Sequence, residues 1–193
     1  NREFDTIYHE HINFFNIKSM NELTKRVNLK LYHVEKNPIH GSSYLFVIKF
    51  KSKSNKIEKI IKKEKYLNYL YYKKWGIECS KVVKKIQKKI IEIKKKNIII
   101  GYGAAAKANT FLNFSKIKLD YIIDDNKLKQ NKYCPGSKIL IKSSNLLKKI
   151  KQNIYVLPLA WNFHKEIKKR VKKIRPRYSD KFIICFPKFK IQK

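Results

Sequence analysis

The sequence predicts an α/β fold whose second half is built around a parallel sheet, and three observations carry this prediction. Short apolar runs at 97–100, 119–123, 154–157 and 181–184 have the length and composition of buried strands. Amphipathic segments with helical spacing separate these runs. A glycine-rich turn, Gly101-Tyr102-Gly103, directly follows the first run and opens a helix. Such alternation is typical of a Rossmann-like domain, which we place at residues 96–193.

The smaller elements of this domain follow from the same patterns. Between the strands we predict helices at 104–114, 143–150 and 162–173, and a short strand at 138–141 after the Pro135-Gly136 turn. Residues 54–95 repeat apolar positions at steps of three and four, so we interpret this segment as a helical linker.

Residues 1–53 predict a loop, a short helix and a β-hairpin. Ser19 and Glu22 have the spacing of a capping box, which places the helix start near Ser19, and Asn28 can end the helix in left-handed backbone. Two strands at 29–36 and 43–51 would be joined by turn residues at 37–41. A lone hairpin is marginal in water, so this part needs a sheet to join.

The composition excludes some function classes. The 47 basic residues outnumber the 14 acidic ones, which gives a formal charge of +33. The lysines are spread from end to end and only five arginines occur, so we expect no specific nucleic-acid partner. No run approaches the roughly 20 apolar residues of a membrane span, so no membrane partner is expected. Three scattered cysteines fit a reducing cytoplasm and indicate no metal site.

The glycine turn matches the dinucleotide fingerprint G-x-G-x-x-G/A, with Ala106 as the third small residue. Gly101 would permit the tight turn and Gly103 the close approach of a phosphate, while Asp124 follows at the distance of a ribose-binding acid. A nicotinamide cofactor is one interpretation. The other is a tight strand-to-helix turn that binds no ligand.

The second constellation is the tetrapeptide Tyr8-His9-Glu10-His11. In an extended segment, the two histidines would share one face, with Tyr8 and Glu10 on the other. Imidazole is the most frequent general base, so a catalytic role is one interpretation and an ordinary surface loop is the other. The spacing does not indicate a metal site.

Several motifs in a fixed order resemble the C-terminal half of the S-adenosylmethionine-dependent C-methyltransferases of nucleotide-linked sugars. They lie at 4–15, 38–41, 101–110, 121–126, 135–136 and 159–163. The resemblance implies that residues 1–53 close a class I methyltransferase-type middle domain. It also implies that the donor, S-adenosylmethionine, is bound by a region missing from this chain, and that zinc belongs only to a missing upstream module.

The resemblance also implies roles for individual residues. His11 would be the catalytic base, and Glu10 and Tyr8 would hold or polarise the sugar. The sugar nucleotide would be bound by the glycine turn and residues beyond it, namely Gly101, Gly103, Ala106, Lys107, Asn109, Asp124 and Asn162. Two alternatives stay open: a non-catalytic remnant or binding module of the same family, and a weaker one, a nicotinamide-dependent oxidoreductase domain.

Overall fold

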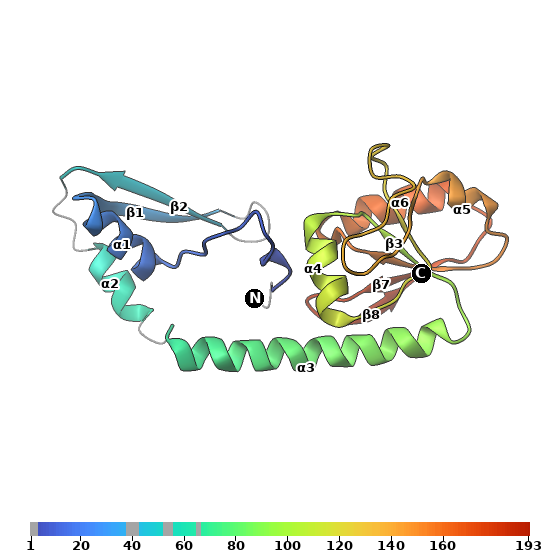
Figure 1. Ribbon diagram of the computed structural model, residues 1–193, viewed down its shortest axis with the longest axis horizontal. Coiled ribbons are helices and arrows are strands. Elements are labelled where there is room, and N and C mark those ends of the chain that lie inside the picture. Colours follow the sequence, from blue (N-terminus) through green and yellow to red (C-terminus); the bar gives the residue numbers. More distant parts are fainter. Residues whose placement is uncertain (1–3, 38–42, 52–55, 65–66) are drawn as a thin grey trace. The chain divides into compact units, whose positions relative to one another are not determined.

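The computed structural model describes residues 4–37, 43–51, 56–64 and 67–193, and the chain divides into two compact units (Figure 1). Unit 1 comprises Asn1–Glu10 and Ile77–Lys193, and unit 2 comprises His11–Gly76. No helix of the described residues combines the length and the apolar character that crossing a membrane requires.

Unit 2 contains a two-stranded antiparallel sheet and two helices. In chain order they are α1 (Ile17–Arg26), β1 (Lys30–Asn37), β2 (Ser43–Lys49) and α2 (Lys56–Lys63). One side chain from each of α1, β1 and α2 forms the buried centre, namely Ile17, Leu31 and Ile57. The predicted helix and hairpin are therefore present. Residues 38–41 of the predicted turn lie outside the described part.

The predicted capping box of α1 is wrong by one helical turn. The helix begins at Ile17, with Asn16 as its N-cap: the Asn16 side chain accepts from the Ser19 N–H at 2.7 Å, and the Ser19 hydroxyl accepts from the Asn16 N–H at 3.0 Å. Ser19 is thus the third residue of the helix and completes the capping box there, instead of being the N-cap. The predicted end is confirmed, because Asn28 has a φ of 55°.

The long helix α3 (Tyr69–Lys94) begins in unit 2 and ends in unit 1. Its buried residues within unit 1 are Cys79, Val83, Ile86 and Ile90, at steps of three and four. This spacing places them on one face of the helix, while the lysines between them face solvent.

Unit 1 is built on a six-stranded, mostly parallel sheet in the order β5-β4-β3-β6-β7-β8. Its strands are β3 (Ile99–Tyr102), β4 (Tyr121–Ile123), β5 (Ile141–Lys142), β6 (Tyr155–Pro158), β7 (Lys181–Ile184) and β8 (Lys190–Gln192). Only β8 is antiparallel to its neighbour. The predicted α/β class is confirmed. Strand β8 was not predicted, because Ile191 is its single apolar residue.

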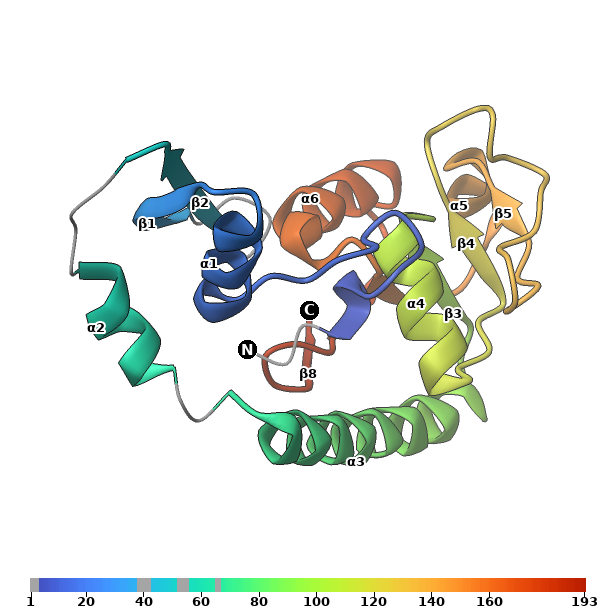
Figure 2. The same ribbon diagram turned by 60° about the vertical axis from the view of Figure 1, so that its left-hand side comes forward.

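Helices cover both faces of this sheet (Figure 2). Helices α5 (Asn145–Lys149) and α6 (His164–Ile174) pack Leu147, Ile167 and Val171 against one face. Helix α4 (Ala106–Ser115) lies on the other, where Phe111 and Leu157 of β6 line the same small cavity. Two short 3-10 helices, η1 (Phe4–Thr6) and η2 (Trp161–Phe163), complete the unit. Phe4 of η1 packs on Phe114 of α4, with ring centroids 5.0 Å apart.

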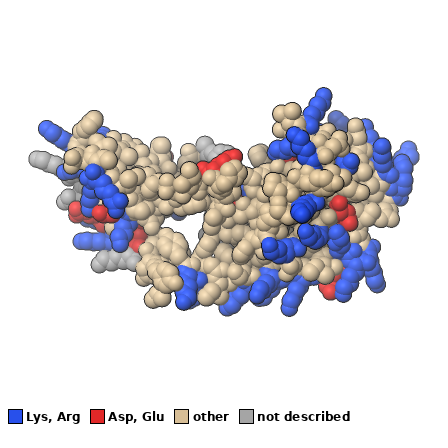
Figure 3. Space-filling view, viewed as in Figure 1, with Lys and Arg blue, Asp and Glu red and all other residues tan. Residues whose placement is uncertain are grey.

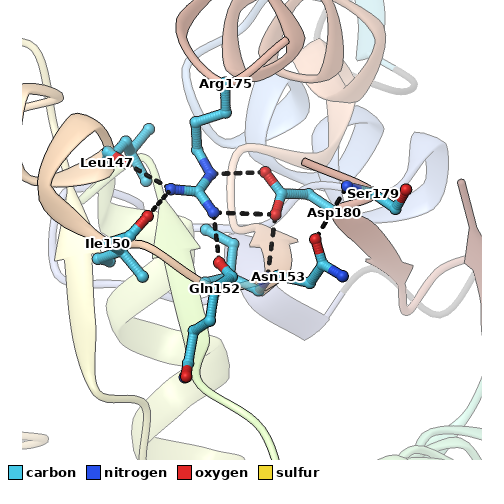
Figure 4. A network of polar contacts seen from close by, with 8 residues as sticks. Leu147, Ile150, Gln152, Asn153, Arg175, Ser179 and Asp180 are labelled. Carbon is cyan, nitrogen blue, oxygen red and sulfur yellow. Dashed lines mark hydrogen bonds and ion pairs between the residues drawn. The ribbon is translucent and has the colours of Figure 1, made fainter. Parts of the chain in front are cut away.

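A buried arginine ties together the chain segments that precede β6 and β7 (Figure 4). Arg175, 2% exposed, pairs with Asp180 through Nε at 2.7 Å. Its other guanidinium nitrogens donate to Asp180 again and to the carbonyl oxygens of Leu147, Ile150 and Gln152. Asp180 Oδ1 also accepts from the Ile154 N–H at 3.0 Å. These five bonds match the five N–H donors of a guanidinium.

Candidate functional site

The sheet of unit 1 has a topological switch point between β3 and β6. From β3 the chain continues outward to β4 and β5 on one side, and it then returns to β6 on the other side of β3. In open α/β sheets of this kind, ligands bind at the carboxyl ends of the strands beside the switch point. The loops that follow β3 and β6 are therefore the expected location of a ligand site.

Gly101 lies within β3 and not in the tight turn predicted for it, and Gly103 lies in the loop that follows the strand. Both glycines are closely packed by the protein itself. A Cβ on Gly101 would lie 2.8 Å from a methyl carbon of Leu159 and 2.9 Å from one of Leu119. Gly103 has a φ of +96°, and its Cβ would lie 3.1 Å from the Cβ of Ala160, which follows β6. The absence of a side chain at Gly101 leaves room for Leu119 and Leu159, and its absence at Gly103 allows the loops after β3 and β6 to touch. A ligand-binding role for these glycines stays a prediction.

Asp124, at the end of β4, is engaged by backbone groups. Its Oδ2 accepts from the Ala104 N–H at 2.7 Å, and its Oδ1 accepts from the Asn126 N–H at 2.8 Å. The Lys129 ammonium lies 3.8 Å from Oδ2 and also donates to the Ala104 carbonyl at 2.9 Å. The carboxylate therefore fastens the glycine turn to β4. This arrangement favours a structural role over the contact with ribose that a nicotinamide cofactor would need.

Asp125, the next residue, belongs to a separate cluster. The Tyr102 hydroxyl donates to its carboxylate at 3.1 Å, and Arg170 of α6 pairs with it at 2.9 Å. Burial raises the pKa of Tyr102 to about 12, and the neighbouring Asp125 charge adds to the shift. Tyr102 is therefore a neutral hydrogen-bond donor at physiological pH rather than a base.

Lys107, in the first turn of α4, has a buried ammonium group. No described residue hydrogen-bonds to its Nζ, which is shielded from solvent. The nitrogen lies 5.4 Å from the centre of the Trp161 ring. The predicted binding residue Lys107 thus reaches toward the loop after β6, at the switch point. A buried cation without a hydrogen-bonding partner is unusual, because desolvation penalises an unpaired charge.

Trp161 is held in place by Asp5 of η1. Its indole Nε1 donates to the Asp5 carboxylate at 2.8 Å, and Asp5 is 4% exposed. Asp5, Trp161 and Phe111 border a small cavity of about 20 Å³, which is room for one water molecule. The sequence patterns alone do not single out Asp5 or Trp161. Both lie within the motifs at 4–15 and 159–163 whose resemblance to a known family was noted above, and that resemblance was the available signal.

The remaining predicted binding residues lie on the same two loops or on α4. Ala106 is the first residue of α4, and Asn162 is an exposed residue of η2 beside Trp161. Asn109 carries a buried side-chain oxygen to which no described residue donates. The structure therefore brings Gly103, Lys107 and Asn162 to the ends of β3 and β6. Their binding roles stay predictions.

The tetrapeptide Tyr8–His11 forms a turn rather than an extended segment. The His9 ring lies near Tyr8, with centroids 6.5 Å apart, and its Nε2 is 3.9 Å from the Glu10 carboxylate. His11 is exposed and packs edge-on against Phe14, with centroids 6.0 Å apart. The division between the units falls directly before His11. Among the described residues, no group of three or more His, Cys, Asp or Glu side chains could hold a metal.

Comparison with known proteins identifies the family. A family model described as the C-methyltransferase C-terminal domain matches residues 38–187. The C-methyltransferase NovU of Streptomyces niveus is 25% identical over 178 residues, which cover 86% of this chain and 42% of that protein. The chain therefore spans less than half the length of this relative. Because the family match extends over most of the sequence, the chain belongs to the C-methyltransferase C-terminal domain family.

Proposed function

We propose that this chain is the C-terminal part of an S-adenosylmethionine-dependent C-methyltransferase that acts on a nucleotide-linked keto- or deoxy-sugar. Family membership over residues 38–187 is the observation that carries the methyltransferase assignment. The sugar substrate rests on the motifs that resemble the sugar C-methyltransferases, among them the Tyr8–His11 segment. A cytoplasmic location accords with this assignment.

In this proposal the two ends of the chain have different tasks. Residues 1–53 close a methyltransferase-type domain and present His11, residues 54–95 link the parts, and residues 96–193 contribute to the sugar-nucleotide site. The exposed apolar side chains of the hairpin, such as Leu45 at 54% and Ile48 at 40%, support a need for further sheet.

The methyl donor does not fit the glycine turn of unit 1. Ala160 lies against Gly103, and both oxygens of the Asp124 carboxylate are bonded to the N–H groups of Ala104 and Asn126, so this carboxylate is not open to the ribose of the donor. We therefore assign donor binding to a separate domain. No described residues fit a zinc site either, and the proposal gives zinc no role in this chain.

The step assigned to this chain is proton removal next to the sugar carbonyl. The His11 imidazole takes the proton from that carbon, and the electron pair of the C–H bond moves into an enolate whose oxygen gains negative charge. Glu10 and Tyr8 hold or polarise the sugar beside the base. The protein has to position the base and stabilise the developing oxyanion.

We expect His11→Asn to lower turnover by roughly 10²–10⁴-fold, the usual cost of losing a general base, with little change in sugar-nucleotide affinity. The measurement is exchange of the sugar α-proton in deuterated water, on the chain supplied with a donor-binding domain. His9→Asn is the matched control, since it removes the neighbouring imidazole and leaves His11 in place.

Three outcomes of the exchange assay are informative. Loss of exchange with His11→Asn alone supports the proposal. Loss with His9→Asn alone would mean that the base is the other imidazole. Exchange that ignores both substitutions would remove this segment from the chemistry and favour the alternative of a non-catalytic binding module.

A further inference from the structure

Asp5 of η1 is a buried carboxylate at a position where an apolar side chain would be less costly. It is the second residue of a three-residue 3-10 helix and is 4% exposed. The Trp161 indole N–H donates to its Oδ2 at 2.8 Å, across 156 positions of sequence. Desolvation penalises a buried charge, so stability alone does not account for a carboxylate here.

Asp5 has a neutral partner although the chain is strongly basic. The sequence has 47 basic residues against 14 acidic ones, and lysine and arginine side chains cover much of the visible surface in Figure 3. Exposed acidic residues pair with these cations: Glu22, Glu78 and Glu92 each contact a lysine three positions later. The indole N–H carries no charge, so its bond to Asp5 supplies direction rather than charge neutralisation.

Phe4, the residue before Asp5, attaches η1 to unit 1 without fixing its orientation. Its ring packs against three other rings, with centroid distances of 5.0 Å to Phe114, 6.0 Å to Phe186 and 6.4 Å to Phe111. The hydrophobic attraction in such packing is non-directional. A hydrogen bond depends on angle as well as distance, so the bond between Asp5 and Trp161 fixes how η1 lies on unit 1.

The segment that η1 holds leads directly to the proposed base. The Tyr8 N–H donates to the Thr6 carbonyl oxygen at 3.1 Å, so the hydrogen-bonded backbone continues from η1 to Tyr8. Glu10 is the last residue of this part of unit 1. His11 follows Tyr8 by three residues, a reach of at most about 11 Å. A shift of η1 would therefore move the backbone that carries the base.

Trp161 holds the other end of the bond at the predicted sugar-nucleotide loop. It is the first residue of η2, after β6, and it directly precedes Asn162. Its ring also lies 5.4 Å from the ammonium of Lys107. One hydrogen bond thus joins the segment that precedes the proposed base to the loop on which the sugar nucleotide is predicted to bind.

We infer that Asp5 and Trp161 are positioning residues, whose hydrogen bond sets the place of the segment leading to His11 for proton removal from the sugar. The inference rests on the proposed function for the identity of the reaction. Neither residue takes the proton, since the indole N–H and the carboxylate are bonded to each other. Their effect is indirect: a displacement of about 1 Å in a reacting group can cost about 100-fold in rate.

The first measurement is exchange of the sugar α-proton in deuterated water, on the chain supplied with a donor-binding domain. We expect Trp161→Phe, which removes the N–H and keeps a ring, to lower the exchange rate at saturating sugar nucleotide by about 10–100-fold, with little change in the half-saturating concentration. Asp5→Leu should cause a similar loss. Asp5→Asn, whose amide oxygen can accept the same bond, should restore most of the rate. Trp75→Phe is the matched control, because it makes the same substitution in α3 and should leave the rate unchanged.

The second measurement is amide hydrogen exchange of the 193-residue chain, which needs no substrate. We expect Trp161→Phe and Asp5→Leu to speed exchange in residues 4–8, including the bonded Tyr8 N–H, by at least about 10-fold, the equivalent of one hydrogen bond to a charged group. The Ile99 N–H, which starts β3, should exchange at the parent rate. A change confined to residues 4–8 shows local release of η1 and not a loss of the fold.

Unchanged α-proton exchange in Trp161→Phe and Asp5→Leu would overturn the inference, whatever their amide exchange. An equal loss in Asp5→Asn and Asp5→Leu would overturn it as well, because the loss would then not follow the hydrogen bond. Both results leave the proposed function standing if His11→Asn abolishes the exchange seen in the parent. A parent whose exchange does not depend on His11 would instead remove the proposed function and the positioning role together, even where the amide measurement shows release of residues 4–8.

Discussion

The two ends of the sheet in unit 1 each bury a cation, and they treat it in opposite ways. At the amino ends of β6 and β7, Arg175 is paired with Asp180 and with three carbonyl oxygens (Figure 4). At the carboxyl ends of β3 and β6, Lys107 has no hydrogen-bonding partner among the described residues. The fold thus supplies hydrogen-bond acceptors for every N–H of one buried cation and, within the described part of the chain, none for the other. The first cation is used to hold the fold together, whereas the second is left unpaired by the described part of the fold, and its predicted role in binding stays a prediction.

Aspartate side chains also have different partners at the two ends of the sheet. At the amino ends, Asp120 and Asp180 each accept an N–H from the start of a neighbouring strand, at Ile99 and Ile154. These bonds fix the order of the strands. At the carboxyl ends, Asp124 fixes the glycine turn and thereby the start of α4, which carries Lys107.

The largest expected effect is at the amino ends. Arg175→Met should lower the free energy of unfolding by about 3–5 kcal/mol, because it leaves buried Asp180 without its partner. Urea denaturation measures this loss. Arg177→Met, two residues away at an exposed position, is the matched control and should change stability by less than about 0.5 kcal/mol. Similar stability of the two variants would show that the Arg175 network does not hold the fold.

A smaller effect is expected where the loops after β3 and β6 meet. Gly103→Ala should destabilise the chain by about 1–3 kcal/mol, since its φ of +96° strains any other residue and the new methyl group would crowd Ala160. Gly76→Ala is the control in helix α3, where nothing lies within 4 Å of an added Cβ, and it should stabilise by about 0.5–1 kcal/mol. A stable Gly103→Ala protein would mean that the two loops can separate at little cost.

Local patterns in the sequence predicted most of the secondary structure. The apolar runs located β3, β4, β6 and β7 within two residues at each end, because buried parallel strands are apolar throughout. The capping box was misplaced because Ser19 can act from either position of the motif. Its observed partner, Asn16, precedes the residues that show helical spacing.

The candidate site was only partly predictable. The sequence pointed to the glycine turn and to Lys107 beyond it, since the turn has a local signature, and their binding roles stay predictions. The bond between Asp5 and Trp161 joins residues 156 positions apart, and the Arg175 bonds reach back 23 to 28 positions to their carbonyl partners. Pairings of this range depend on the folded chain and have no periodic signal. The bond from the Ala104 N–H to Asp124, 20 positions later, could not be predicted for the same reason.

The most direct test of the contrast is the stability of Lys107→Met, measured by urea denaturation with and without pyrophosphate. Without the anion we expect this variant to be more stable than the parent by about 1–3 kcal/mol, because it removes a buried and unpaired charge. Pyrophosphate at 100 times its dissociation constant should then stabilise the parent by about 2.7 kcal/mol and leave the variant nearly unchanged. A Lys107→Met protein that is less stable than the parent, as expected for Arg175→Met, would show that Lys107 is a structural residue and contradict the account.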